Sequence, residues 1–246
     1  MVSRKHTYIT LSKLLSTATK RLSLYLTLPS RIRDKILIFF SGFLNISLTI
    51  PSLVNKDIYR VYDFLCRVAS SRVYIEFENF MVRSCDCEGM LVFHPNYEYT
   101  LTITLLRLLK RGSIFVDIGA HLGRYTILAS KIVGPQGLVI ALEPIPETYK
   151  VLKDNVKKNN LNNIIVLPLA AWNVNTTLEF TVPPGRSGST AKSLKHVSGI
   201  QLRGRKVRVK ATTLDMLILE KLNLKRVDVI KIDVEGARLK FWKDLK

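Results

Sequence analysis

A short apolar stretch that ends in an acid and two glycines carries the first chemical signal. In FVDIGAHLGRYT, residues 115–126, the apolar run reaches Asp117 and is followed by Gly119 and Gly123. This pattern predicts a buried strand, a tight turn and the start of a helix, with glycines that let the backbone pass close to a ligand. Ligands of open α/β sheets bind beyond the carboxyl ends of the strands, so the turn is a predicted ligand site.

Phosphate-bearing ligands do not suit this turn. A dinucleotide fingerprint that starts at Gly119 needs glycines where His121 and Arg124 stand, which disfavours NAD and FAD. The G-x-x-x-x-G-K-[ST] pattern of ATP and GTP sites is also absent from the sequence. S-adenosylmethionine has no phosphate and instead needs an acid near its ammonium group and a carboxylate for its ribose hydroxyls.

Two carboxylates could meet those needs. Asp117 ends the predicted strand, and Glu143 ends the next one, where a carboxylate commonly accepts both ribose hydroxyls. Each has a structural alternative, Asp117 as the cap of the following helix and Glu143 as a surface turn residue. Their joint spacing favours binding of S-adenosylmethionine.

The elements that must hold these residues alternate along the chain. Strands are predicted at IFVDIG, LVIALEP, IIVLPLA and VDVIKIDVEG, with helices at 124–133 and 147–160 between them. Strands that alternate with helices predict a parallel sheet with crossover helices. Residues 177–213 are expected to form a β-rich insertion. Upstream, we expect helices at 57–69 and 100–110 and one or two strands within 73–84.

Five segments in this order resemble the FkbM-type family of S-adenosylmethionine-dependent methyltransferases: FVDIGAHLGRYT, IALEPIPETYKVLKDNVKKNN, GSTAKSL, ATTLDML and VIKIDVEGA. The resemblance implies a Rossmann-like class I methyltransferase, an α/β fold with a parallel-rich sheet and helices on both faces. It divides the chain into a helical N-terminal extension (1–72), a β-rich lead-in with a linker helix (73–111) and the S-adenosylmethionine-binding domain (112–246).

The resemblance also assigns roles to individual residues. The residues carried over to the cofactor site are Asp117, Gly119, His121 and Gly123 in the turn, Glu143 at the ribose, and Ala171 and Trp172 beside the adenine. Asp233 and Glu235 fall at the mouth of the site, where either could act as a base or hold a divalent metal ion. Glu235 and Gly236 also form a common turn and helix-start sequence, which leaves a structural role open. Lys231 is expected only to neighbour Asp233 and favour its charged form.

The implied reaction is O-methylation of a hydroxyl on a sugar, glycan or other small metabolite. One alternative is an RNA methyltransferase, suggested by eight basic and no acidic residues between Phe180 and Leu214. Neither an Asn-Pro-Pro-Tyr base-flipping motif nor interleaved aromatic residues support it. Another alternative is a shortened, non-catalytic cofactor-binding module, because few residues follow Asp233 and Arg238 stands where the family commonly has an acid.

The shortened end has a physical consequence. If the strands that usually follow are missing, the apolar strand Val227–Val234 leaves a sheet edge unpaired. We expect the strands near Val73–Ser84 or a second copy of the chain to cover that edge, unless the product folds poorly. Cys66, Cys85 and Cys87 can form neither a closed disulfide framework nor a structural zinc site, so reduced thiols in a cytoplasmic protein are expected.

The charge and the N-terminal stretch raise the question of a membrane. The formal net charge of +19 predicts attraction to anions, with an anionic membrane surface as a candidate partner. Ile36–Asn55 holds no charged residue and follows a basic segment, as in a membrane span. Pro51 and several polar residues favour instead a helical cap that packs on the domain and could touch the membrane.

Overall fold

The structure is a computed structural model that describes residues 64, 74–85, 88–95, 97–182, 190–191 and 204–234. The predicted helical extension, the stretch Ile36–Asn55, most of the predicted helix at 57–69, and Glu235 lie outside these residues. None of the helices that the structure describes has the length and apolar character needed to cross a membrane.

Four parallel strands form the central sheet. They are β3 (Ile114–Ile118), β4 (Leu138–Leu142), β5 (Ile164–Leu167) and β10 (Val229–Ile232), in the order β10-β3-β4-β5. All three pairings are parallel. Because crossover helices cover such sheets, their strands are apolar on both faces. The predicted parallel sheet is confirmed.

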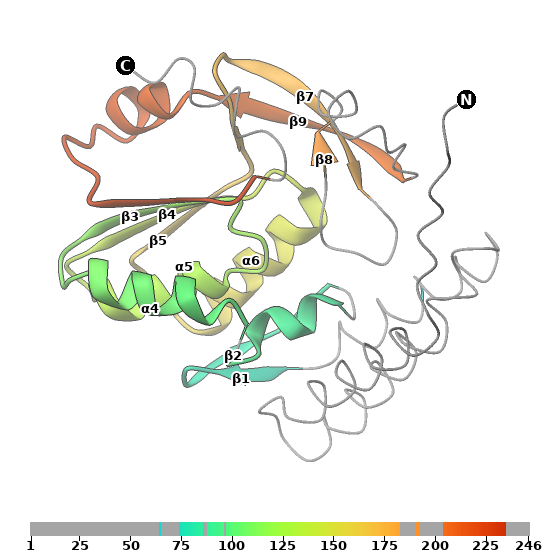
Figure 1. Cartoon of the computed structure of the whole chain (residues 1–246). Helices are drawn as coiled ribbons and strands as arrows, with labels where there is room; N and C mark the ends of the chain where they lie inside the picture. Colours follow the sequence, from blue (N-terminus) through green and yellow to red (C-terminus); the bar gives the residue numbers. More distant parts are fainter. Residues whose placement is uncertain are drawn as a thin grey trace, which may run out of the picture.

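Helices lie on both faces of this sheet (Figure 1). On one face are α4 (Tyr99–Leu108), α5 (Arg124–Val133) and α6 (Pro146–Lys158), and on the other is the π-helical segment η3 (Met216–Lys221). Alternate residues of β3 divide between the two cores: Phe115 packs with α5, and Val116 packs with Leu217 of η3. This is the predicted Rossmann-like α/β architecture.

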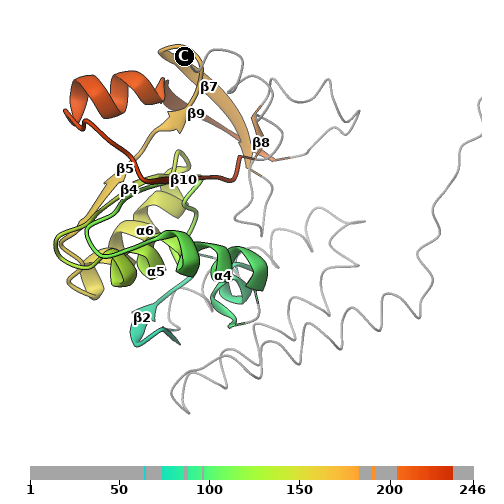
Figure 2. The same cartoon turned by 60° about the vertical axis from the view of Figure 1, so that its left-hand side comes forward.

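The predicted β-rich insertion is a second sheet. It contains β6 (Ala170–Ala171), β7 (Thr176–Val182), β8 (Thr190–Ala191) and β9 (Arg205–Thr212), in the order β6-β9-β7-β8. In β9, Val207, Val209 and Ala211 are buried and alternate with exposed basic residues. Figure 2 shows β7 and β9 above the parallel sheet.

The lead-in begins with a hairpin of β1 (Ile75–Phe77) and β2 (Phe80–Val82), followed by the 3-10 helix η1 (Glu88–Phe93). Glu78 and Asn79 both have positive φ, 51° and 70°, as the two-residue hairpin turn of type I′ requires. The strands predicted within 73–84 are confirmed, and they pair with each other.

Two asparagines of α6 determine where this hairpin docks. Asn159 accepts a hydrogen bond from the Met81 N–H (2.8 Å) and donates to its carbonyl (2.9 Å). Asn155, one helical turn earlier, binds the N–H and carbonyl of Arg83 in the same way, at 2.9 and 3.0 Å. The expectation that these strands cover the edge of Val227–Val234 is therefore wrong, because α6 binds the backbone of β2 and the segment after it.

Within the described residues, β10 is an edge strand of the parallel sheet, at the opposite edge from β5. Its Ile230 is 42% exposed, while its neighbour Lys231 is buried. The predicted sheet edge is thus present in the described part of the chain, and its cover by a second copy stays a prediction.

Candidate active site

Three residues with left-handed backbone conformation lie in the turn after β3. Gly119, His121 and Gly123 have φ of 74°, 54° and 96°. The N–H groups of Gly119 and Ala120 both donate to the carbonyl of Leu142, at 3.0 Å each, so the turn is held against the end of β4. Gly123 is the N-cap of α5, and no side chain caps this helix. The alternative role of Asp117 as a helix cap is wrong.

Gly119 is needed for a contact within the protein. A Cβ atom at this position would lie 2.0 Å from the backbone oxygen of Asp233, which follows β10. At Gly123, a Cβ atom would lie 2.5 Å from the Cδ1 atom of Leu152, the end of a side chain that can move. The first glycine therefore fixes how closely β10 approaches the turn, whereas the sequence pattern predicts a close approach to a ligand.

Glu143 bridges the turn and the loop after β4. One carboxylate oxygen accepts the N–H of His121 and the other that of Ile145, both at 2.9 Å. The residue is 6% exposed, so the alternative of a surface turn residue is wrong. Burial raises the pKa of Glu143 to about 7, although the two backbone N–H groups oppose the shift. Each oxygen retains a second acceptor position, as a ribose diol would require.

Asp117 and Lys231 form a buried ion pair directly across the β3–β10 ladder. The Lys231 Nζ atom lies 3.1 Å from Asp117 Oδ1, and Thr126 donates to Asp117 Oδ2 at 2.7 Å. Burial acts to lower the pKa of Lys231, but Asp117 and Asp233 outweigh it, and the pKa lies above its ordinary value. The role of Asp117 as a ligand of the cofactor's ammonium group stays a prediction, and its partners here are Lys231 and Thr126.

Asp233 lies next to this ion pair, on its solvent-exposed side. Its side chain is 53% exposed and its Oδ2 atom lies 3.7 Å from Lys231 Nζ. Its N–H donates to the carbonyl of Ile118 at 2.9 Å, which continues the pairing of β10 with β3. An exposed carboxylate thus lies beside the buried ion pair. The second residue predicted for this role, Glu235, is outside the described residues.

The His121 imidazole lies close enough to Lys231 and Asp233 for their charges to act on it. Burial and then Lys231 lower the pKa of His121 to about 4, against a smaller opposing effect of Asp233, so the ring is neutral near pH 7. Its Nε2 atom is buried and, among the described residues, has no hydrogen-bond partner. A buried polar atom of this kind is suited to a bound ligand.

Ala171 and Trp172 come from the second sheet. Trp172 is 8% exposed and packs with Ile145, two residues beyond Glu143. Ala171 packs with Ile118 and Leu142 on the other face of the parallel sheet. The contact between Trp172 and Ile145 brings the insertion to the loop that contains Glu143, and the adenine role of both residues stays a prediction.

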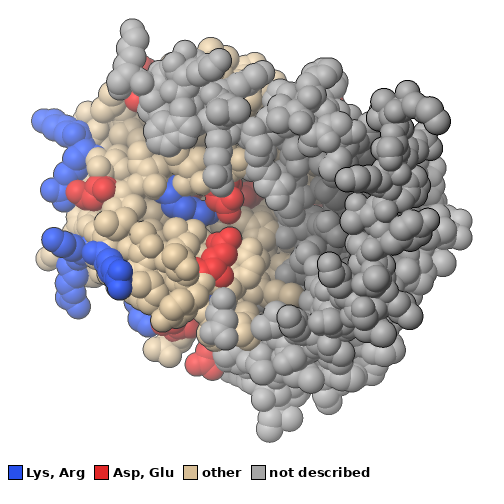
Figure 3. All heavy atoms as spheres, viewed as in Figure 1, with Lys and Arg blue, Asp and Glu red and all other residues tan. Residues whose placement is uncertain are grey.

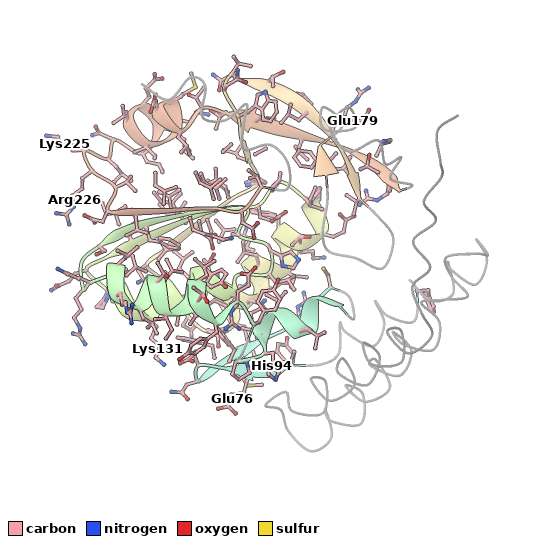
Figure 4. All side chains as sticks on the ribbon, in the orientation of Figure 1. Glu76, His94, Lys131, Glu179, Lys225 and Arg226 are labelled. Atoms are coloured by element: carbon pink, nitrogen blue, oxygen red, sulfur yellow. The ribbon has the colours of Figure 1, made fainter. Side chains whose placement is uncertain are left out.

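Sequence reasoning missed Arg124, which is 2% exposed. Its guanidinium donates to the carbonyls of Val92 (2.8 Å) and His94 (2.9 Å) and lies 4.9 Å from the centre of the Phe77 ring. It therefore ties the first turn of α5 to the lead-in, where Figure 4 labels His94. No sequence signal separates this arginine from a solvated one at a helix start.

Comparison with known proteins identifies the family. The sequence model of the Methyltransferase FkbM domain matches residues 117–241, just over half of the chain. The chain belongs to the FkbM methyltransferase family. Its resemblance to that family is confirmed, and with it the S-adenosylmethionine-dependent methyltransferase class and the class I fold.

The curated relatives of this FkbM domain include two fungal methyltransferases. Methyltransferase 1 of Beauveria bassiana is 26% identical over 140 residues, which cover 52% of this chain and 56% of that protein. Methyltransferase sdnD of Sordaria araneosa is 27% identical over 159 residues, 55% of this chain and 61% of that protein. The chain thus matches less than two thirds of the length of either relative. Among solved structures, TYW2 of M. jannaschii in complex with AdoMet is 25% identical, with a TM-score of 0.33, over 39% of this chain and 42% of that one.

The residues present fit S-adenosylmethionine, the cofactor of this class, in three respects. Glu143 is a buried carboxylate with spare acceptor capacity, His121 offers an unpartnered buried nitrogen, and α5 begins without a side-chain cap. Such a helix start suits the methionine carboxylate. Asp117 fits less directly, because it is fully buried and paired with Lys231. Within the described residues, no group of three His, Cys, Asp or Glu side chains could hold a metal ion.

Proposed function

We propose that this FkbM domain transfers a methyl group from S-adenosylmethionine to a hydroxyl oxygen of a sugar, glycan or other small metabolite. The observation that carries the proposal is Asp233, a half-exposed carboxylate beside the cofactor turn. The other two carboxylates of the site, Asp117 and Glu143, are 0% and 6% exposed. Asp233 is therefore the carboxylate of this group that an acceptor can reach.

The proposed role of Asp233 is to take the acceptor's proton. S-adenosylmethionine supplies an electrophilic methyl group on its sulfonium. As the C–O bond forms and the C–S bond breaks, the hydroxyl proton passes to the Asp233 carboxylate. A positioned base of this kind contributes about 10²–10⁴-fold in rate. Lys231 Nζ lies 3.7 Å from Asp233 Oδ2 and gives this carboxylate a positively charged neighbour.

Transfer to RNA is the alternative that the basic charge suggests. The exposed face of β9 carries Lys206, Arg208 and Lys210. Lys206 already has two partners in the protein. Its Nζ atom donates to the Thr181 hydroxyl at 2.5 Å and lies 3.9 Å from Glu179 Oε1. On the face shown in Figure 3, Lys and Arg side chains gather at the left-hand edge, where Figure 4 labels Lys225 and Arg226. Both residues precede β10, so they lie at the opposite end of that strand from Asp233. These positions favour a small acceptor over RNA.

Transfer of labelled methyl from S-adenosylmethionine to a panel of hydroxyl-bearing sugars and metabolites tests the proposal. With an acceptor in hand, Asp233→Asn should lower kcat by about 10²-fold or more with little change in cofactor affinity, since it removes the base and keeps the shape. Asp215→Asn is the matched control, because Asp215 is an exposed aspartate of a different segment. A parallel reaction with EDTA tests for a divalent metal ion.

Three results would count against the proposal. Unchanged kcat in Asp233→Asn would remove Asp233 from the chemistry. Salt-sensitive methylation of RNA in place of the small acceptors would favour the RNA methyltransferase. Cofactor binding without transfer to any acceptor would favour a non-catalytic module.

A further inference from the structure

The buried charges of the site are arranged around one ammonium group. Lys231 is directly opposite Asp117 in the parallel ladder, although the two residues are far apart in the sequence. Their side chains are 7% and 0% exposed. A carboxylate in such a place is costly unless a charged partner and hydrogen bonds compensate it.

Lys231 also holds the cofactor turn. Its Nζ atom donates to the carbonyl of Gly119 at 2.9 Å and lies 5.4 Å from the centre of the Tyr125 ring. A single ammonium therefore contacts the last part of β3, the left-handed turn and the first turn of α5. Asp233, at 3.7 Å, is the more distant of its two carboxylate partners.

We propose that Lys231 is a positioning residue of the S-adenosylmethionine site, which neutralises Asp117 within the sheet and fixes the Gly119 carbonyl. The turn then keeps the conformation in which His121 donates to Glu143. The expectation that Lys231 only supports Asp233 is thereby replaced by a link to Asp117. The proposal rests on the cofactor site of the proposed function and not on the identity of the acceptor.

A double-mutant cycle in cofactor affinity tests this role. Isothermal titration with S-adenosylmethionine is performed on the wild type, Lys231→Met, Asp117→Asn and the double variant. Lys231→Met leaves a buried carboxylate unpaired and should weaken affinity by tenfold or more. The double variant removes both charges, so it should bind at least tenfold more tightly than Lys231→Met.

The cycle separates this role from direct contact with the cofactor. If Lys231 itself bound the cofactor, or if Asp117 bound its ammonium group, the double variant would bind no better than Lys231→Met, and that result would overturn the proposal. If Lys231→Met does not fold, a double variant that folds and binds S-adenosylmethionine supports the proposal, and one that does not fold or bind contradicts it. Wild-type binding without methyl transfer would reject the proposed reaction and leave this inference standing.

A pH series adds a readout that loss of packing would not move. In Lys231→Met, the Asp117 carboxylate is buried without its positively charged partner, and a bound proton would remove this uncompensated charge. The ratio of the affinity of Lys231→Met for S-adenosylmethionine to that of the double variant should therefore rise as the pH falls from 8 to 5. In the double variant Asp117 is absent, and this component should vanish. The other titratable or charged groups around Lys231 are present in both proteins: Glu98, His121, Tyr125, Glu143 and Asp233. The charge of Asp117 also acts on Glu143, so the ratio reports every effect of removing the Asp117 charge. A ratio that does not change with pH would contradict the proposal.

Discussion

Two lysine–carboxylate pairs with the same separation lie in different surroundings in this domain. Lys231 Nζ and Asp117 Oδ1 are 3.1 Å apart inside the sheet, and Lys131 Nζ and Glu78 Oε2 are 3.1 Å apart on the surface. The side chains of the first pair are 7% and 0% exposed, and those of the second pair 43% and 49%. Figure 4 labels Lys131 at the periphery of the molecule.

The contrast shows that burial, and not distance, decides what such a pair does. In water, an exposed pair gains little because the solvent screens both charges and each side chain loses freedom. In the sheet, removal of either Lys231 or Asp117 leaves the other charge buried and without solvation by water. The buried pair can therefore determine the conformation of the turn after β3, while the exposed pair supports a hairpin turn only weakly.

Removal of the buried lysine should have the largest effect on stability. Lys231→Met should lower the free energy of unfolding by about 3–5 kcal/mol, the range found when one partner of a buried pair is lost. Urea denaturation followed by circular dichroism measures the change. A loss below about 1 kcal/mol would mean that the pair behaves like an exposed one, and the comparison would fail.

Gly119→Ala should have the next largest effect. The added Cβ would meet the Asp233 carbonyl, and the left-handed φ of 74° adds strain. We expect a loss of about 2–4 kcal/mol in unfolding free energy, together with loss of cofactor binding. Gly112→Ala is the matched control, because Gly112 has a φ of 81° but no atom within 4 Å of the added Cβ. A loss no larger than that of the control would show that the contact with Asp233 can relax freely.

Glu143 should make cofactor affinity depend on pH. Its pKa of about 7 leaves it mostly protonated at pH 6 and mostly ionised at pH 8. Only the ionised form can accept both ribose hydroxyls, so affinity for S-adenosylmethionine should rise about tenfold between these values. Titration calorimetry at both values measures the change, and Glu143→Gln should abolish it. An equal affinity of the wild type at pH 6 and 8 would contradict this assignment.

The raised pKa of Glu143 acts in the opposite direction on the stability of the cofactor-free protein, which should fall as the pH rises. The folded state retains its proton up to about pH 7, while the unfolded chain loses it near 4.5. The contribution of Glu143 to the free energy of unfolding therefore falls as the pH rises from about 4.5 to 7. Bound cofactor should offset that loss above pH 7.

The exposed pair should have the smallest effect. Lys131→Met should lower the free energy of unfolding by at most about 1 kcal/mol, and the loss should shrink further in 1 M salt. Parallel denaturation of Lys131→Met and Lys231→Met compares the two lysines directly. Similar losses in the two variants would remove burial as the explanation of their difference.

Local patterns were sufficient to predict where the glycine turn, the helix after it and Glu143 lie. The helix predicted at 124–133 is α5, and the glycine turn lies where the apolar strand ends. Glu143 could be singled out because it ends the neighbouring parallel strand, where carboxyl ends meet at one edge of the sheet. These features depend on residues that are close in the sequence or on a general rule of the fold.

The register of distant strands could not be predicted in this way. Lys231 pairs with Asp117 because β10 is added beside β3 in one register, which no local pattern specifies. The one indication of this pairing in the sequence was a lysine within an otherwise apolar strand. The docking of the hairpin depends on Asn155 and Asn159. In the sequence, nothing distinguishes these two asparagines from solvent-exposed ones on other helices. Side chains that act through tertiary contacts carry no distinctive spacing.

Titration calorimetry of the wild type and Glu143→Ala with S-adenosylmethionine tests directly whether Glu143 holds the cofactor. The matched control is Glu220→Ala, which removes an exposed glutamate of η3. We expect the wild type and the control to bind the cofactor, and Glu143→Ala to lose binding while it remains folded. A folded wild type that does not bind, or a Glu143→Ala variant that binds equally well, would contradict this expectation.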